Sequence, residues 1–137
     1  MGSASGLRFL LDTHIWIWSL EASDRLTDQV REELRAPSNE VWLSPVSAWE
    51  AMVLVQKGRL IVEPPPQDWV RRALERVPHR EAPLNHEVAL RSRTVSLPHN
   101  DPADRFLAAS AQVYDLTLVT ADDRLLHSAD FAVLANR

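Results

Sequence analysis

The hydrophobic positions of the chain gather into short apolar runs separated by longer stretches of mixed character. The runs at 7–11, 41–43 and 116–119 are nearly continuous in their hydrophobicity, which is typical of strands buried on both faces of a parallel sheet. A further run at 131–134 can close the sheet. The segment 81–84 is predicted as an edge strand, because Pro83 lacks the N–H that a central strand needs.

Between these runs the spacing of apolar residues predicts helices. Leu26, Val30 and Leu34 recur at intervals of four, which places them on one face of an amphipathic helix. The segments expected to be helical are 14–20, 27–35, 46–57, 69–74, 85–93 and 102–114. The expected order is β-α-α-β-α-α-α-α-β-α-β or close to it. This alternation predicts an α/β fold, with a parallel sheet covered on both faces.

Length and composition fit one compact domain. The 137 residues, 45% of them hydrophobic, can form one core and leave little room for a second, so residues 7–137 are assigned to a single domain. Residues 1–6 are small and are expected to be a disordered lead or an expression remnant. No apolar run approaches the roughly 20 residues of a membrane span, and no signal segment is found. A cytoplasmic protein without membrane contact is therefore expected.

Charge and cysteine content exclude several classes. The net charge of −4 argues against a general nucleic-acid-coating protein. The absence of Cys excludes a disulfide framework, a thiol nucleophile and Cys-ligated zinc. The five His residues do not form an HExxH motif, and the three Gly residues cannot form a P-loop or a GxGxxG loop. No Ser lies in a GxSxG elbow.

Acidic residues follow two of the predicted strands. Asp12 comes directly after the first apolar run, and Asp122 and Asp123 come shortly after the run at 116–119. The carboxyl ends of parallel strands are where α/β sheets build sites, so these acids are candidate site residues. Asp12 or Thr13 can cap the next helix, and Thr120 can orient a water or a carboxylate. Side chains alternate in direction, so one of the two adjacent acids is expected to face the site.

Two further acids lie on predicted helices. Asp101 precedes Pro102 in a strong helix-start pattern, so its expected role is the N-cap. Asp104 then falls at the third helical position, from which it can point toward the strand ends. Glu50 lies in a helix that is apolar nearly all round, and a charged Glu in such surroundings is rarely left unpaired.

Taken together, the acids predict a divalent-metal site. Two unit charges about 4 Å apart repel by about 4 kcal/mol at an effective dielectric near 20, so converging carboxylates call for a cation. Oxygen ligands from Asp and Glu suit Mg²⁺ or Mn²⁺. Such ions activate water and stabilise charge on phosphoryl oxygens. Our hypothesis is that these acids hold a divalent metal for phosphodiester cleavage.

Two other functions are compatible with the same acids. A Mg²⁺-dependent phosphatase or phosphoacceptor domain also places acids at the ends of parallel strands. It would usually have a second Asp two residues after the first, where this chain has His14, and a catalytic Lys, whereas Lys57 is the only lysine. The other alternative is a non-catalytic binding module with a vestigial acidic pocket.

Four motifs resemble those of the PIN-domain ribonucleases, and specifically of the VapC-type toxins of bacterial toxin–antitoxin pairs. They occur in the family's order and spacing, and the resemblance covers nearly the whole chain from Leu7 on. In chain order, the motifs are Leu10–His14, Ser47–Glu50 with Lys57–Leu60, His99–Arg105 and Val119–Asp122.

The resemblance implies a PIN-domain-like three-layer α/β/α fold around a central, mainly parallel sheet of about five strands. It implies a Mg²⁺-dependent endoribonuclease, with Mn²⁺ able to substitute, in which water attacks the phosphorus in line. Asp12, Asp104 and Asp122 would bind metal directly, and Glu50 would hold a ligand water or a second ion.

The resemblance also implies the partners. The substrate would be RNA, and a cognate antitoxin would insert a segment near the acidic site of a homodimer. The candidate substrate contacts are His14, Arg105 and Arg124, although the two arginines can equally form salt bridges to the nearby acids. The RNA target, the number of metal ions and the identity of the antitoxin stay open.

Overall fold

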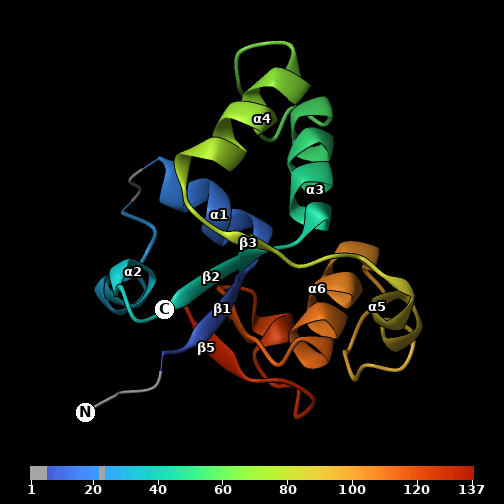
Figure 1. Cartoon of the computed structure of the whole chain (residues 1–137). Coiled ribbons are helices and arrows are strands. Elements are labelled where there is room, and N and C mark those ends of the chain that lie inside the picture. Colours follow the sequence, from blue (N-terminus) through green and yellow to red (C-terminus); the bar gives the residue numbers. More distant parts are fainter. Residues whose placement is uncertain (1–5, 22–23) are drawn as a thin grey trace.

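The centre of the protein is a sheet of five parallel strands, described here in a computed structural model that covers residues 6–21 and 24–137 (Figure 1). The strand order is β3-β2-β1-β4-β5, and every neighbouring pair is parallel. The α/β fold with a parallel sheet of five strands is therefore confirmed. The strands are β1 (Arg8–Leu11), β2 (Glu40–Leu43), β3 (Arg80–Glu81), β4 (Thr117–Thr120) and β5 (Val133–Ala135).

The helices begin where the sequence places polar capping residues. The side chains of Thr27, Ser44 and Asn85 accept hydrogen bonds from backbone N–H groups in the first turns of α2, α3 and α5. Within the described residues the helices are α1 (Thr13–Leu20), α2 (Asp28–Arg35), α3 (Pro45–Gln56), α4 (Pro66–Arg76), α5 (His86–Arg91) and α6 (Pro102–Val113), with a 3₁₀ turn η1 (Asp123–Leu125).

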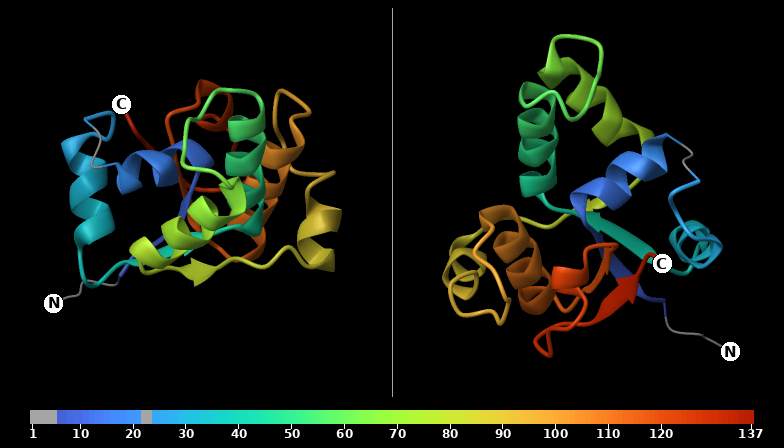
Figure 2. Two further views of the ribbon diagram at one scale, coloured as in Figure 1. Left: turned by 90° about the horizontal axis from the view of Figure 1, so that it is seen from above. Right: turned by 180° about the vertical axis from the view of Figure 1, so that it is seen from behind.

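Successive side chains of β1 enter two different hydrophobic cores, one on each face of the sheet. Phe9 and Leu11 are buried in a core that α1 to α4 share, whereas Leu10 is buried in a second core with Leu107 of α6. Successive side chains of a strand point to opposite faces, so both faces of the central strand are covered. Figure 2 shows α5 and α6 on one side of the sheet and α1 and α2 on the other, which is the expected three-layer arrangement.

Several boundaries differ from the sequence prediction, including those of α4, which occupies 66–76 rather than 69–74. The edge strand β3 occupies 80–81 rather than 81–84, because the chain leaves the sheet after Ala82, and Pro83 has no N–H to pair. The last strand occupies 133–135 instead of 131–134. The helix expected between the last two strands is only the turn η1, which Asp122 caps and which ends at Leu125.

The strand order creates the place for a site. From β1 the chain adds β2 and β3 on one side of the sheet, then returns to add β4 and β5 on the other. The carboxyl end of β1 therefore lies at a topological switch point beside the carboxyl end of β4, where open α/β sheets bind ligands. Asp12 directly follows β1, and Thr120 ends β4.

The expected lead at residues 1–6 lies outside the described residues except for Gly6. Gly6 lies against the backbone carbonyl of Ser38, where a Cβ would collide with it. This close approach explains why the chain uses glycine just before β1. Along the described part of the chain, no helix has the length and apolar character needed to cross a bilayer.

Candidate active site

An open acidic cleft lies at the carboxyl ends of β1 and β4. It brings together the four predicted ligands from four separate segments: the start of α1, the middle of α3, the start of α6 and the loop after β4. The lining residues are Asp12, His14, Trp18, Glu50, Asp101, Asp104, Ala121, Asp122 and Arg124.

Asp12 is held rigidly at the bottom of this arrangement. Its side chain is 7% exposed, and it is the N-cap of α1. Oδ1 accepts a hydrogen bond from the backbone N–H of Thr13 at 2.7 Å, and Oδ2 accepts one from the Thr120 hydroxyl at 2.7 Å. The Thr120 hydroxyl also accepts from the backbone N–H of Asp122 at 3.0 Å. Thr120 therefore links the acid after β1 to the acid after β4.

The Thr13 hydroxyl ties the start of α1 to α3. It donates to the Ser47 hydroxyl at 3.0 Å, and both residues are fully buried. Ser47 lies three residues before Glu50, so the two share one face of α3. Ser47 was not among the predicted site residues, although this spacing within its motif could have indicated it.

Trp18 is a second lining residue that the sequence prediction missed. It follows His14 by one helical turn, and the two ring centroids lie 5.8 Å apart. The spacing of four residues on one helix is the signal that could have paired them. Together they form an aromatic wall of the cleft.

Asp104 is positioned by two neighbours. Asp101 Oδ1 accepts a hydrogen bond from the backbone N–H of Asp104 at 3.1 Å, so Asp101 is the N-cap of α6, as predicted. The carboxylate of Asp104 is hydrogen-bonded to His99 Nε2 at 2.7 Å. Asp104 is only 6% exposed, and the cap directs it into the cleft.

The acids form one electrostatic cluster. Burial raises the pKa of Asp12 to about 6, and the charge of Asp104 adds to this shift. Burial also raises the pKa of Glu50, with further contributions from Asp12 and Asp101. The pKa of Asp104 is raised by burial and by the charges of Asp101 and Asp122. Each of these carboxylates thus makes it harder to ionise another, as expected for a site that requires a cation.

The raised pKa of Asp12 predicts that its ionisation destabilises the metal-free fold. The folded protein retains the proton up to about pH 6 and the unfolded chain releases it near 3.8, so the penalty appears between these values and is complete above them. Asp12→Asn should therefore raise the free energy of unfolding relative to the wild type. This increase should be larger at pH 8 than at pH 4 by about 1–3 kcal/mol. Urea denaturation in EDTA measures both proteins, and a pH-independent difference would contradict the prediction.

The donor set fits a hard divalent cation. Carboxylate oxygens of Asp12, Glu50, Asp104 and Asp122 line one cleft, and no softer sulfur ligand is present because the chain has no Cys. As the side chains are placed, no three His, Asp or Glu residues in the described part of the chain converge closely enough to hold one ion. Arg124, which pairs with two of the four acids, lies among them.

Four predicted residues are not among those that line the cleft: Thr13 and Thr120, which lie behind Asp12, and Asp123 and Arg105. Asp123 forms an ion pair with Arg137, whereas its neighbour Asp122 faces the cleft. Arg105 was a candidate phosphate contact, but it is 8% exposed, and its guanidinium donates to the backbone carbonyls of Ser92, Val95 and His99. Its observed contacts are therefore with the segment that precedes α6, and it is not among the residues that line the cleft.

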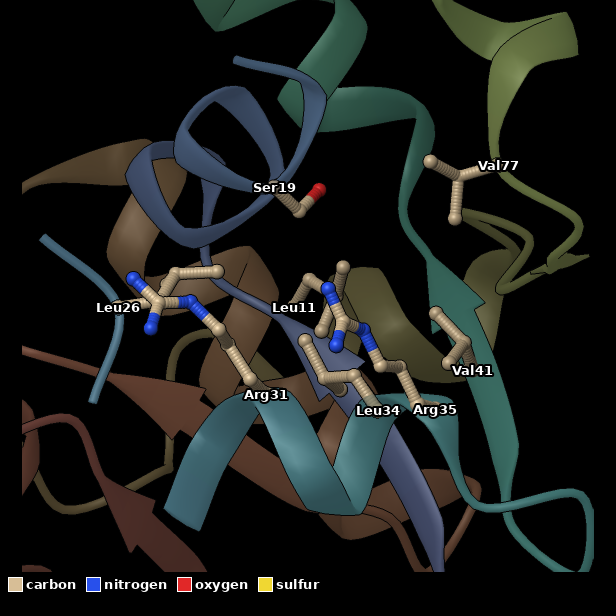
Figure 3. Close-up of a pocket in the computed structure, with 8 residues that line it drawn as sticks. All are labelled: Leu11, Ser19, Leu26, Arg31, Leu34, Arg35, Val41 and Val77. Atoms are coloured by element: carbon tan, nitrogen blue, oxygen red, sulfur yellow. The ribbon is translucent and has the colours of Figure 1, made fainter. Parts of the chain in front are cut away.

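A second hollow lies on the other side of α1, between α2 and β2 (Figure 3). Its lining is mainly aliphatic, with Leu11 from β1 and Leu34 from α2. The charged residues are Arg31 and Arg35, both on α2, and Arg31 pairs with Asp28. The lining includes no carboxylate, so the acid chemistry belongs to the cleft at β1 and β4.

The chain belongs to the PIN-domain family. The family profile described as "PIN domain" matches residues 9–131, which span both cores and all four acids of the cleft. Divalent-metal dependence is general in this family.

Similar proteins include one curated relative and several solved structures. Ribonuclease VapC22 of Mycobacterium tuberculosis (strain ATCC 25618 / H37Rv) is 29% identical over 119 residues, covering 85% of this chain and 88% of that protein. VapBC2 from Rickettsia felis, bound to a DNA fragment from their promoter, matches with a TM-score of 0.65 and 15% identity, covering 94% and 98% of the two chains. VapBC-5 from Mycobacterium tuberculosis, a member of the VapBC family of toxin–antitoxin systems, matches with a TM-score of 0.60 and 19% identity, covering 93% and 98%. At these identities the solved structures establish the fold.

Proposed function

We propose that this protein is a Mg²⁺-dependent endoribonuclease that acts as the toxin of a toxin–antitoxin pair, with Mn²⁺ able to replace Mg²⁺. The observation that carries the proposal is the convergence of four acids, from four segments, in one cleft of a PIN domain. The curated relative is named a ribonuclease, which supports RNA as the substrate.

The proposed metal ligands are Asp12, Asp104 and Asp122, with Glu50 acting through a water or on a second ion. When bound, the ion would supply water activation and neutralise charge at the phosphoryl oxygens. Thr13 and Thr120 fix both oxygens of Asp12 before substrate arrives. His99 is hydrogen-bonded to one carboxylate oxygen of Asp104, and Asp101 accepts a hydrogen bond from its backbone N–H. This prior orientation avoids the cost of ordering the site during the reaction.

Substrate contacts are proposed for the two cationic or polar side chains that line the cleft. His14 and Arg124 border the acids and can contact phosphate oxygens next to the cleaved bond. Arg suits phosphate because its planar group donates two hydrogen bonds at once.

The proposed partners are a cognate antitoxin and a second copy of the chain. The similar VapBC structures contain toxin–antitoxin complexes, which supports an antitoxin for this chain. A homodimer and a cytoplasmic location complete the proposal.

The two alternative functions have less support in the site. A phosphoacceptor domain would use a catalytic Lys, but Lys57 is exposed at the C-terminal end of α3 and is not among the residues that line the cleft. A vestigial pocket would have no reason to retain a buried carboxyl that is held at both oxygens, because burying it costs stability.

Removal of the metal tests the proposed function. RNA incubated with the purified protein and Mg²⁺ should be cleaved above the rate of a protein-free control. Excess EDTA should return cleavage to the control rate, and Mg²⁺ or Mn²⁺ added beyond the EDTA should restore it, because the acids alone lack the charge that the reaction requires. Cleavage that persists in EDTA would contradict the metal-dependent function, and no cleavage of RNA under any metal condition would favour the alternatives.

A further inference from the structure

Arg124 lines the acidic cleft and pairs with two of its four acids. Its Nη2 lies 2.9 Å from Asp122 Oδ2 and 3.5 Å from Asp104 Oδ2, and its Nε donates to Asp122 Oδ1 at 3.2 Å. The guanidinium therefore binds both oxygens of one proposed ligand and reaches a second. Among the described residues that line the cleft, no other is an Arg or Lys.

The pairing changes the properties of Asp122. Hydrogen bonding to Arg124 lowers the pKa of Asp122, in contrast to the raised pKa values of the other proposed ligands. The carboxylate of Asp122 is thus already neutralised by a positive charge from its own chain. Among the described residues, no arginine pairs with the carboxylates of Asp12 and Glu50, and burial raises the pKa of both.

Arg124 also borders a second hollow outside the acidic cleft. Its side chain is 54% exposed, and it forms part of the wall between the acidic cleft and a neighbouring hollow lined by His127 and Ser128. A rotation about its side-chain bonds can carry the guanidinium from one hollow to the other without moving η1. An ion pair made by so exposed an arginine contributes little free energy, so an incoming cation can displace it.

We propose that Arg124 is a built-in counter-cation of the acidic cleft, which occupies the space of the divalent ion and gives way when the ion binds. This inference rests on the proposed function, because it takes Asp104 and Asp122 as ligands of the ion. A guanidinium and a divalent cation repel each other and compete for carboxylate oxygens, so Arg124 should weaken binding of the ion at Asp104 and Asp122.

Mn²⁺ binding to two variants tests the inference without an activity assay. Arg124→Gln removes the counter-cation, and Arg137→Gln removes the same charge from a nearby pair with Asp123 outside the cleft. At pH 8 and low salt, calorimetry or the paramagnetic resonance of free Mn²⁺ should give a Kd at least fivefold lower for Arg124→Gln than for the wild type. Arg137→Gln should stay within twofold of the wild type.

Thermal melting supplies a second readout and verifies folding. In EDTA, Arg124→Gln should melt below Arg137→Gln because it leaves Asp104 and Asp122 without their positive partner, and Mn²⁺ should raise its melting temperature more. Equal or weaker Mn²⁺ binding by Arg124→Gln, relative to Arg137→Gln, would overturn the inference and mean that Arg124 orients Asp122 for the ion. No Mn²⁺ binding by any of the three proteins would overturn it together with the metal-dependent function.

Discussion

Asp104→Asn should reduce RNA cleavage by at least about 100-fold while the protein stays folded. The change removes one negative charge from the proposed metal site and replaces a carboxylate oxygen with a weaker amide ligand. Losing one preorganised group that stabilises developing charge typically costs about 10²–10³ in rate. Burial and neighbouring acids raise the pKa of Asp104, so its charge is a burden in the metal-free protein and the Asn variant should melt no lower in EDTA. Single-turnover cleavage of a random-sequence RNA pool at saturating Mg²⁺ measures the rate.

Asp123→Asn is the matched control for this variant. It removes the same charge from the residue next to Asp122, but Asp123 pairs with Arg137 and does not line the cleft. The control should retain the wild-type rate within about twofold, since surface charges away from the reacting group contribute little. A comparable loss in both variants would indicate a general effect of charge on RNA binding, and a retained rate in Asp104→Asn would exclude Asp104 as a ligand.

The four acids could be predicted because each follows a local signal. Asp12 and Asp122 come after apolar strands, and Asp104 falls three residues after a capping Asp. Parallel strands bring their carboxyl ends to one edge, so the strand prediction places Asp12 and Asp122 at the same edge of the sheet. The observed strand order, with β4 beside β1, then brings them together. Glu50 could be predicted as a candidate because its helix is apolar nearly all round. Its role as a ligand came from the resemblance to the family.

The hydrogen-bond pairing within the site, meaning which side chain holds which acid, could not be predicted in the same way. The Thr120–Asp12 hydrogen bond joins residues 108 positions apart, and the Thr13–Ser47 bond spans 34 positions. Which hydroxyl meets which carboxylate depends on the register of β1 against β4 and on how α3 packs against α1. A sequence pattern fixes neither quantity. The same holds for Arg124, because the sequence does not show whether it forms a salt bridge or contacts a phosphate.

Element lengths depended on similarly non-local facts. The edge strand β3 is only two residues long because its pairing is limited by β2, not by the hydrophobicity of 81–84. The turn η1 spans only Asp123–Leu125, although the carboxylate of Asp122 caps its start. Boundaries of this kind follow from pairing and capping partners, whereas the type and order of the long helices follow from apolar periodicity.

Arg105 shows how tertiary structure can redirect a residue with an apparent function. Its place directly after Asp104 made it a natural phosphate contact. In the structure it is buried and donates to the carbonyls of Ser92 at 2.7 Å, Val95 at 2.9 Å and His99 at 3.1 Å. Those carbonyls belong to the segment between α5 and α6, and among the described residues no backbone N–H donates to them.

Arg105→Met should therefore destabilise the protein by about 3–5 kcal/mol, because it leaves buried carbonyl groups without donors. Arg105→Lys should recover only part of this loss, since one ammonium group cannot reach all three carbonyls with the geometry of a guanidinium. Arg93→Met, at an exposed position in the same segment, is the matched control and should stay within about 0.5 kcal/mol of the wild type. Urea denaturation in EDTA compares the four proteins. Equal stability of Arg105→Met and Arg93→Met would show that the segment does not depend on the arginine, whereas a selective loss would mean that Arg105 holds His99 in place beside Asp104 and so supports the acidic cleft from behind.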